Sequence, residues 1–91
     1  MLEFEWDEQK AAANYVKHGV RFAAASAVFS DPFAVDQEDR TVQYDEIRRI
    51  IIGIADGMIL TIVYTERGDA IRIISARRAT KSERHTYEDA D

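Results

Sequence analysis

The chain has no cysteine and only one proline among its 91 residues. The absence of cysteine excludes disulfide bonds and thiolate metal sites. The scarcity of proline, together with a hydrophobic content of 46%, is typical of a globular protein and not of a disordered segment. A chain of this length can build one hydrophobic core, so we expect residues 1–91 to form a single domain.

Long hydrophobic runs are missing as well. The longest apolar stretch, Ile50–Ala55, is far shorter than the ~20 residues that a membrane-spanning helix needs. The N-terminus does not show the basic and then apolar pattern of a secretory signal peptide. We therefore expect no membrane association and a cytoplasmic location.

Positive charge is scarce overall, because the formal net charge is −5, but it is unevenly distributed. Residues 1–47 carry a net charge of −6, residues 48–85 carry +4, and the last six residues carry −3. The total charge argues against a nucleic-acid partner, whereas the basic segment is compatible with one, because a ligand responds to the local field. Solvated protein surfaces also show such asymmetry, so both interpretations stay open.

Metal-binding and phosphate-loop motifs are absent from the sequence. It contains no HxH or HExxH pattern, no carboxylate cluster at ligand spacing and no glycine-rich phosphate loop. The acidic residues at 36, 38 and 39 lack the glycine of a calcium loop, and we interpret them as a solvated loop. We expect neither a metal ion nor another cofactor.

The first part of the chain predicts one strand and two helices. Alternating apolar and acidic residues predict a strand at Leu2–Trp6. Asp7 can then cap a helix over Glu8–His18, which Gly19 ends. A second helix is expected at about Phe22–Phe29, before the turn that contains the single proline.

Short apolar runs in the second part of the chain predict strands. The expected strands are Phe33–Val35, Asp45–Ala55, Met58–Thr65 and Ala70–Arg77, with a polar loop over Asp36–Thr41 and a turn over Glu66–Asp69. The middle pair is joined by Asp-Gly, the strongest short hairpin signal. Both of these strands are apolar on two faces, so we expect them at the centre of the sheet.

A capping box at Thr80–Glu83 predicts a closing helix from Thr80 to about Asp89. The order of elements predicts an α+β fold. Its antiparallel sheet is expected to carry an N-terminal helix pair and the C-terminal helix packed on it.

Arginines gather where they could serve a metal-free ribonuclease. Such an enzyme must deprotonate or position a 2′-hydroxyl, stabilise the charge of the transition state and protonate the leaving oxygen. A guanidinium suits the second task because its planar fork matches phosphate geometry. The basic residues concerned are Arg67, Arg72, Arg77, Arg78, Lys81 and Arg84.

Arg72 is the most informative of these residues, because it lies among isoleucines of a predicted strand. A charge in such surroundings needs a partner or access to water. It could form a salt bridge, for example with Glu66 or Asp45, or it could clamp a phosphate. Strict alternation places Arg72 and Arg77 on opposite faces, so the two could cooperate only if the strand twists or bulges.

Two histidines and a tyrosine complete the candidates. His18, at a helix C-terminus, could complement the helix dipole or carry a proton, whereas His85 is expected to be exposed. Tyr87 could pack on the sheet or reach a phosphate with its hydroxyl. Glu66 and Glu83 are candidate bases, although Glu83 already belongs to the capping box.

Several motifs together resemble the BrnT toxin family. They are FEWD at 4–7 with Lys10 and Asn14, KHGV at 17–20, DP at 31–32, Glu46 with Arg48, YTERG at 64–68, IRIISAR at 71–77, and AT at 79–80 with Glu83 and Tyr87. The resemblance follows nearly the whole chain in order, and the last motifs are highly specific.

This resemblance implies a RelE-like fold and a metal-independent endoribonuclease that inhibits translation. It also implies a BrnA-type antitoxin with a DNA-binding domain, so that DNA is contacted only through the antitoxin and a homodimer can form within the complex. Carried onto this chain, the catalytic residues would be Arg67, Arg72, Arg77, His18 and Tyr87. Contacts to RNA are assigned to Lys17, Arg78, Lys81 and Arg84.

One departure from the family leaves an alternative open. Many relatives place a histidine shortly before the segment Glu46–Arg48, where this chain has Val42 and Gln43. Either that histidine is dispensable or this protein is a weak catalyst. The alternatives are an inactive toxin-like module for antitoxin binding and operon repression, and an interaction domain whose arginines only form salt bridges.

Overall fold

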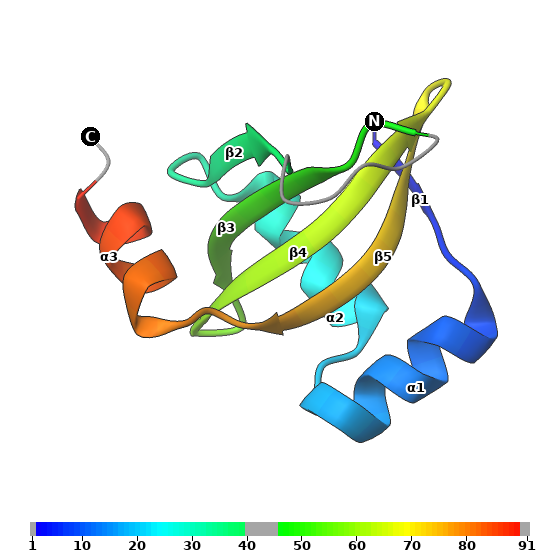
Figure 1. Ribbon diagram of the computed structural model, residues 1–91, viewed down its shortest axis with the longest axis horizontal. Helices are drawn as coiled ribbons and strands as arrows, with labels where there is room; N and C mark the ends of the chain where they lie inside the picture. The colour runs from blue at the N-terminus through cyan, green and yellow to red at the C-terminus, as the bar shows by residue number, and fades with distance from the viewer. Residues whose placement is uncertain (1, 40–45, 90–91) are drawn as a thin grey trace.

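The structure is a computed structural model that describes residues 2–39 and 46–89 of the chain. In chain order its elements are β1 (Glu3–Glu5), α1 (Glu8–His18), α2 (Phe22–Ala25), the 3₁₀ helix η1 (Ser26–Ser30), β2 (Val35–Glu38), β3 (Arg49–Ala55), β4 (Met58–Arg67), β5 (Ala70–Arg78) and α3 (Lys81–Asp89). The strands form a five-stranded sheet in the order β1-β5-β4-β3-β2 (Figure 1). The predicted α+β class is confirmed.

The sheet is mixed, whereas the sequence predicted an antiparallel one. The neighbours β5–β4, β4–β3 and β3–β2 are antiparallel, but β1 pairs with β5 in parallel. A meander of hairpins leaves the outer edge of β5 unpaired, and its backbone groups need partners. β1 supplies them at the start of β5 through the register Phe4↔Ile71 and Glu5↔Arg72.

The expected helix over Phe22–Phe29 is divided in two. It begins as the α-helix α2 and continues from Ser26 as the tighter helix η1. The hydroxyl of Ser26 donates a hydrogen bond of 2.7 Å to the carbonyl of Ala23. Serine side chains that bond the backbone in this way compete with regular α-helical hydrogen bonding.

The predicted boundary between the strand Phe33–Val35 and the loop Asp36–Thr41 is wrong. β2 begins at Val35, the last residue of the predicted strand, and covers residues 36–38 of the predicted loop. This strand pairs with β3 although its side chains are polar and mostly exposed. Asp36 accepts hydrogen bonds from the Tyr64 hydroxyl and, at 3.1 Å, from Arg49 Nε. These tertiary contacts override the weak local pattern. Residues 40–45, including the predicted start of the next strand, lie outside the described residues.

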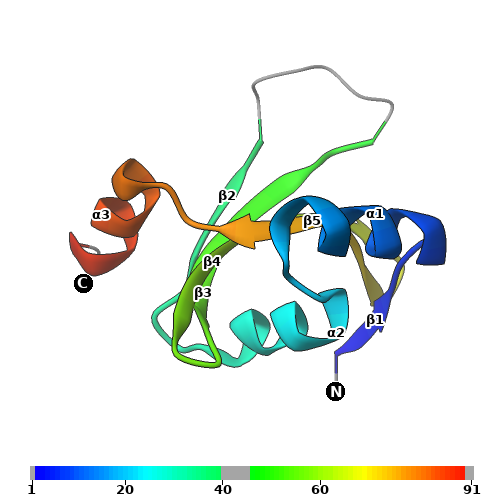
Figure 2. The same cartoon turned by 90° about the horizontal axis from the view of Figure 1, so that it is seen from below.

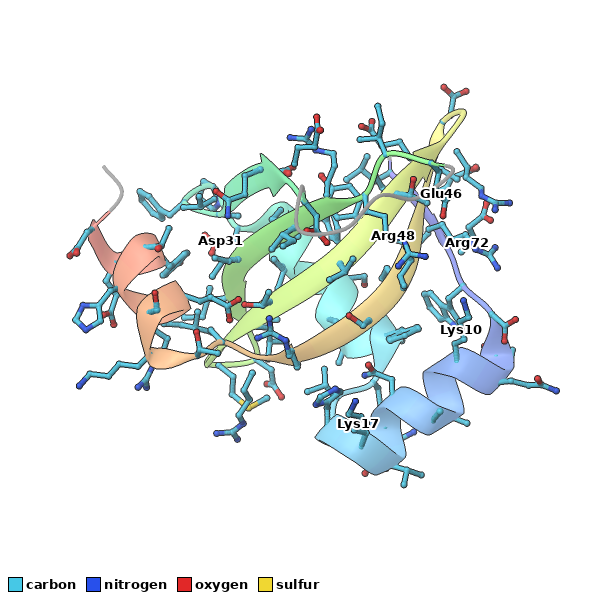
Figure 3. All side chains as sticks on the ribbon, viewed as in Figure 1. Lys10, Lys17, Asp31, Glu46, Arg48 and Arg72 are labelled. Carbon is cyan, nitrogen blue, oxygen red and sulfur yellow. The ribbon has the colours of Figure 1, made fainter. Side chains whose placement is uncertain are left out.

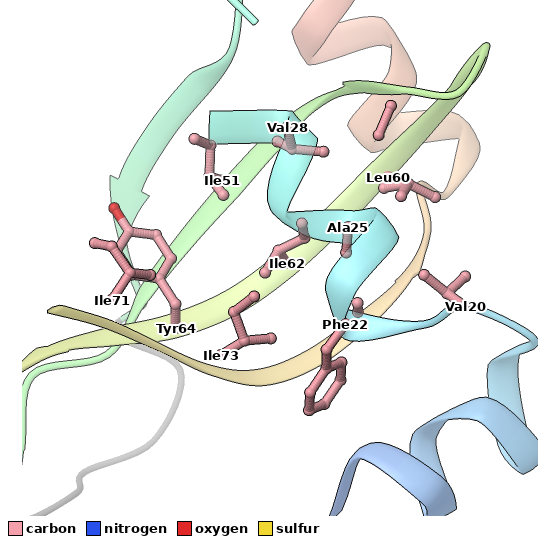
Figure 4. Packing of buried hydrophobic residues seen from close by; sticks show 12 residues of the cluster. Val20, Phe22, Ala25, Val28, Ile51, Leu60, Ile62, Tyr64, Ile71 and Ile73 are labelled. Atoms are coloured by element: carbon pink, nitrogen blue, oxygen red, sulfur yellow. The ribbon is translucent and has the colours of Figure 1, made fainter. Parts of the chain in front are cut away.

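One face of the sheet carries the hydrophobic core. Helices α2 and η1 cover this face, as the views in Figures 2 and 4 show. The buried residues between them and the sheet include Phe22, Ala25, Val28, Ile51, Leu60, Ile62, Tyr64 and Ile73. Gly53 allows the close approach of η1, because a Cβ there would lie 2.9 Å from Val28 Cγ1. Each large side chain buried here stabilises the fold by about 1.5–3 kcal/mol.

Helix α1 lies along the edge of β5 beyond the end of β1, and one of its side chains forms hydrogen bonds with the backbone of β5. The amide of Asn14 donates a hydrogen bond of 2.8 Å to the carbonyl of Ala76 and accepts one of 3.1 Å from the Ala76 N–H. It also donates to the carbonyl of Val20, at 3.0 Å. The buried Asn14 amide therefore stands in for a neighbouring strand and fixes α1 against β5.

A β-bulge in β5 changes which side chains share a face. Val63 pairs with Ser75 and Tyr64 pairs with Ile73, so Ile74 is left without a partner in β4. The extra residue shifts the alternation. As a result Arg72 and Arg77 lie on the same side of the sheet, opposite α2. We call this side the second face; its residues in β4 and β5 are Thr61, Val63, Thr65, Arg72, Ser75 and Arg77.

We predict that Asn14→Ala lowers the free energy of unfolding by about 2–3 kcal/mol, because it leaves buried backbone groups of Ala76 and Val20 without partners. Chemical denaturation would measure this. Gln9→Ala is the control, since it removes an exposed amide from the same helix and should change stability by less than about 0.5 kcal/mol. Equal stability of the two variants would contradict the role of Asn14.

Candidate functional site

Charged side chains gather on the second face near the end of the sheet where β4 turns into β5. Arg72 belongs to this face by its register with Thr65. The side chain of Arg49 points to the other side, where it meets Asp36, and its neighbour Arg48 therefore points to the second face. Figure 3 shows Arg48, Arg72 and Glu46 together here, with Lys10 nearby at the start of α1.

We call Glu5, Lys10, Arg48 and Arg72 the Arg72 cluster. Arg72 Nη1 donates a hydrogen bond of 2.8 Å to Glu5 Oε2, and the two side chains are 28% and 41% exposed. The predicted salt bridge of Arg72 therefore exists, but its partner is Glu5 of β1. An ion pair with this exposure contributes about 0–1 kcal/mol. An anionic ligand can compete with it.

The field of Arg72 reaches the start of α1. Asp7 caps this helix by accepting hydrogen bonds from the amides of Gln9 and Lys10, at 2.8 and 3.1 Å. The hydrogen bond from the Lys10 amide is the main cause that lowers the pKa of Asp7, and the charge of Arg72 lowers it further. Arg72 and the first turn of α1 thus form one electrostatic environment.

A hollow of about 230 Å³ lies between α1 and the bulge of β5. It is lined by Lys10, Ala13, Asn14, Lys17, His18, Ile74 and Ser75. Lys10 lines this hollow and also belongs to the Arg72 cluster. His18, which is partly buried, is therefore placed with two lysines on the border of the second face.

Arg77 is held in a different arrangement. Its Nη1 and Nη2 donate to the two carboxylate oxygens of Glu83 at 2.7 and 2.9 Å. Glu83 also accepts from the Thr61 hydroxyl and the Thr80 amide, both at 2.9 Å. The hydrogen bonds from Arg77 are the main cause that lowers the pKa of Glu83 to about 2. The predicted capping box is confirmed, and its carboxylate is a weak base.

Tyr87 ties α3 to the far end of the sheet. Its hydroxyl donates a hydrogen bond of 2.7 Å to Asp31, which also accepts from the amides of Ile54 and Phe33 at 2.8 and 2.9 Å. The β4 partners of Ile54 and Arg72 are residues 59 and 65, which a strand separates by about 20 Å. Tyr87 and Arg72 therefore lie at opposite ends of the sheet.

The residues predicted from sequence do not form one cluster. Those on the α1 side of the second face, or at the adjoining turn, are Lys17, His18, Arg67 and Arg72. Arg67 Nη2 lies 3.9 Å from Glu46 Oε2, and both side chains are exposed. Those at the opposite end, with α3, are Arg77, Arg78, Lys81, Arg84 and Tyr87.

Sequence reasoning did not assign Glu5, Lys10 or Arg48 to the site. Lys10 could have been found from helical spacing, since Lys10, Asn14 and Lys17 lie on one face of α1. Glu5 had no comparable signal, because its contact with Arg72 depends on the parallel pairing of strands far apart in the chain.

A cavity larger than this hollow lies elsewhere, between α1 and α2, with a volume of about 460 Å³. Its lining is mainly apolar and includes Trp6, Ala11, Tyr15 and Phe22. Arg21, at its border, lies 4.2 Å from the centre of the Tyr15 ring. Such a lining does not suit a phosphate, so the chemistry of the Arg72 cluster makes that cluster the candidate site.

Within residues 2–39 and 46–89, no group of three histidine, aspartate or glutamate side chains is arranged to bind a metal ion. No helix in this described part of the chain combines the length and apolar character needed to cross a membrane.

Comparison with protein families identifies a match. A family model described as "Ribonuclease toxin, BrnT, of type II toxin-antitoxin system" matches residues 6–83. No curated protein sequence matches the chain significantly. The matched segment contains Lys10, Arg48 and Arg72, together with α1 and the whole of β5.

We predict that Glu83→Gln makes stability less dependent on acid pH. The charged form of Glu83 contributes its full stabilisation at pH values above 4.5, the ordinary pKa of a glutamate. This contribution is lost as the pH falls towards the lowered pKa of Glu83, about 2. The melting temperature of the wild type should therefore fall more than that of the variant between pH about 6 and about 3. Glu88→Gln, which is exposed on the same helix, should behave like the wild type. Parallel curves for all three proteins would contradict the prediction.

Proposed function

Since the chain belongs to the BrnT family of ribonuclease toxins of type II toxin–antitoxin systems, we propose that it cleaves RNA without a metal cofactor and that the Arg72 cluster holds the scissile phosphate. The observation that carries this proposal is the convergence of Arg72, Arg48 and Lys10 on one exposed end of the second face. Strand pairing and the amide of Asn14 hold this geometry in place before RNA binds.

The phosphate would bind where Glu5 now pairs with Arg72. A guanidinium can donate two parallel hydrogen bonds to phosphate oxygens. The attraction of additional cations to the phosphate grows as negative charge develops in the transition state. Lys17 extends the positive border along α1, beside the hollow that His18 also lines. Arg67, which is the exposed last residue of β4 although the sequence predicted a turn there, offers a further contact on the other side.

In the proposed reaction the 2′-oxygen attacks the adjacent phosphorus and the bond to the 5′-oxygen breaks. The products are a 2′,3′-cyclic phosphate and a 5′-hydroxyl end, so the leaving oxygen needs a proton. Imidazole is the side chain suited to proton transfer near neutral pH. We therefore assign this transfer to His18, which lines the hollow beside the cluster.

The proposal gives the predicted residues different roles. Arg72, Lys17 and His18 act on RNA, and Arg67 supports its binding. Arg77 and Tyr87 instead attach α3 to the rest of the fold through Glu83 and Asp31, at the end of the sheet opposite Arg72. Arg78, Lys81 and Arg84 would contact only a longer RNA that reaches the other end of the sheet.

In the cell this activity would inhibit translation in the cytoplasm until the antitoxin binds the toxin. We propose that the antitoxin is of the BrnA type, that DNA is contacted only through it, and that two copies of the toxin meet within the complex. The alternatives are an inactive module for antitoxin binding and operon repression, and an interaction domain whose arginines only form salt bridges; one observation favours the interaction domain. Arg67, Arg72 and Arg77 each lie within 4 Å of a carboxylate.

The proposal predicts that the purified protein cleaves single-stranded RNA in the presence of EDTA and leaves 5′-hydroxyl ends. Arg72→Ala should slow cleavage by about 10²–10³-fold, because it removes a donor to the developing charge. Arg21→Ala is the control for loss of an exposed arginine outside the site, and it should retain the wild-type rate. The rate and the 5′ ends of the fragments would be measured on a labelled RNA of mixed sequence.

Two outcomes separate the alternatives. RNA that stays intact with the wild-type protein, while a stable antitoxin complex forms, would support the inactive module. Cleavage by Arg72→Ala at the wild-type rate would leave the activity standing but remove the Arg72 cluster as its site.

A further inference from the structure

We infer that Glu5 is the general base of this reaction and takes the proton from the attacking 2′-hydroxyl. The inference rests on the proposed function, and it assigns the one proton transfer that His18 does not account for. It follows from the position of Glu5 at the sheet edge, its contact with Arg72 and the engagement of the neighbouring carboxylates elsewhere.

The first argument is position. Glu5 is the last residue of β1, and the register of the parallel pair places it directly beside Arg72. Its Oε2 lies 2.8 Å from Arg72 Nη1, and its side chain is 41% exposed. A phosphate that takes the place of Oε2 on the guanidinium would remain next to this carboxylate. The adjacent 2′-hydroxyl would then come within the reach of a general base, about 3 Å.

The second argument is that other carboxylates around the sheet already hold the fold. Asp7 caps α1, Asp36 binds Tyr64 and Arg49, and Asp31 binds Tyr87 and two amides. Glu83 is fixed by the bidentate pair with Arg77. The contact of Glu5 is a single, half-buried ion pair, which RNA can replace. Glu66, a base candidate from the sequence, shares the core side of β4 with Tyr64 by alternation, whereas Glu46, 3.9 Å from Arg67, is a rival on the side of Arg72.

The third argument is electrostatic. A phosphate forms charge-assisted hydrogen bonds with a guanidinium and can therefore replace a carboxylate as its partner. Oε2 of Glu5 lies 2.8 Å from Arg72 Nη1, and the charge of Arg72 also acts on Asp7 at the start of α1. Binding of the substrate would thus release Glu5 from its ion pair and leave it beside the phosphate.

The step balances without another reactant. The proton of the 2′-hydroxyl moves to a Glu5 oxygen while the 2′-oxygen forms a bond to phosphorus. The bond between phosphorus and the 5′-oxygen breaks, and that oxygen receives a proton from the acid on the α1 side. Glu5 then loses its proton to water, and the acid regains a proton from water, so both groups return to their starting states.

The test separates binding from cleavage in Glu5→Gln. Loss of a general base should slow cleavage by about 10²–10⁴-fold. Binding of an uncleavable 2′-O-methyl RNA should be unchanged or tighter, because a negative charge beside the phosphate is removed. Glu3→Gln is the matched control, since it removes the same charge from the same face of β1, and it should cleave at the wild-type rate. Glu46→Gln tests the rival base.

A second variant guards against loss of structure. Glu5→Ala should be inactive but partly restored by formate, a small carboxylate that can occupy the vacated space beside Arg72. Glu5→Gln that cleaves like the wild type, equal losses of binding and cleavage, or failure of formate to restore Glu5→Ala would each overturn the inference. If the wild-type protein itself does not cleave RNA, the proposed function fails instead.

Discussion

The extra residue in β5 is the constraint on which the candidate site depends. Without the bulge at Ile74, Arg77 would point into the core side of the sheet while Arg72 pointed away from it. With the bulge, Arg72, Ser75 and Arg77 share the second face, and the core side still receives Ile73 and Ala76. One local irregularity therefore reconciles an apolar interior with a charged exterior on the same strand.

The arginines of β5 show how the surroundings of a charge determine its use. Arg77 makes two short hydrogen bonds to a carboxylate that is itself held by a hydroxyl and an amide. Arg72 makes one contact with an exposed carboxylate at the sheet edge. The first arrangement is difficult to exchange and joins a helix to the sheet. The second is weak in water, and it leaves a guanidinium that a stronger anion can take.

Much of the fold was accessible from the sequence, because its signals are local. The Asp7 and Gly19 caps, the Asp56-Gly57 turn and the capping box at Thr80 were all predicted and are all present. β2 was misjudged because its polar residues form a strand only when Tyr64 and Arg49 bind Asp36. The site was harder to predict for the same reason. The contact between Glu5 and Arg72 joins residues 67 positions apart, and no local sequence pattern predicts it.

The last helix differs from the rest of the molecule in how it is attached. None of its described residues is buried, and its hydrogen bonds to the sheet come from Glu83 near its start and Tyr87 near its end. An element that is held by polar contacts, with little apolar surface covered, belongs to the low-stability part of a native structure. Separation of α3 from the sheet therefore depends on a few polar contacts, chiefly the pair of Arg77 with Glu83. Loss of these contacts would leave the end of the sheet that carries Arg72 undisturbed, because β1 and α1 hold that end.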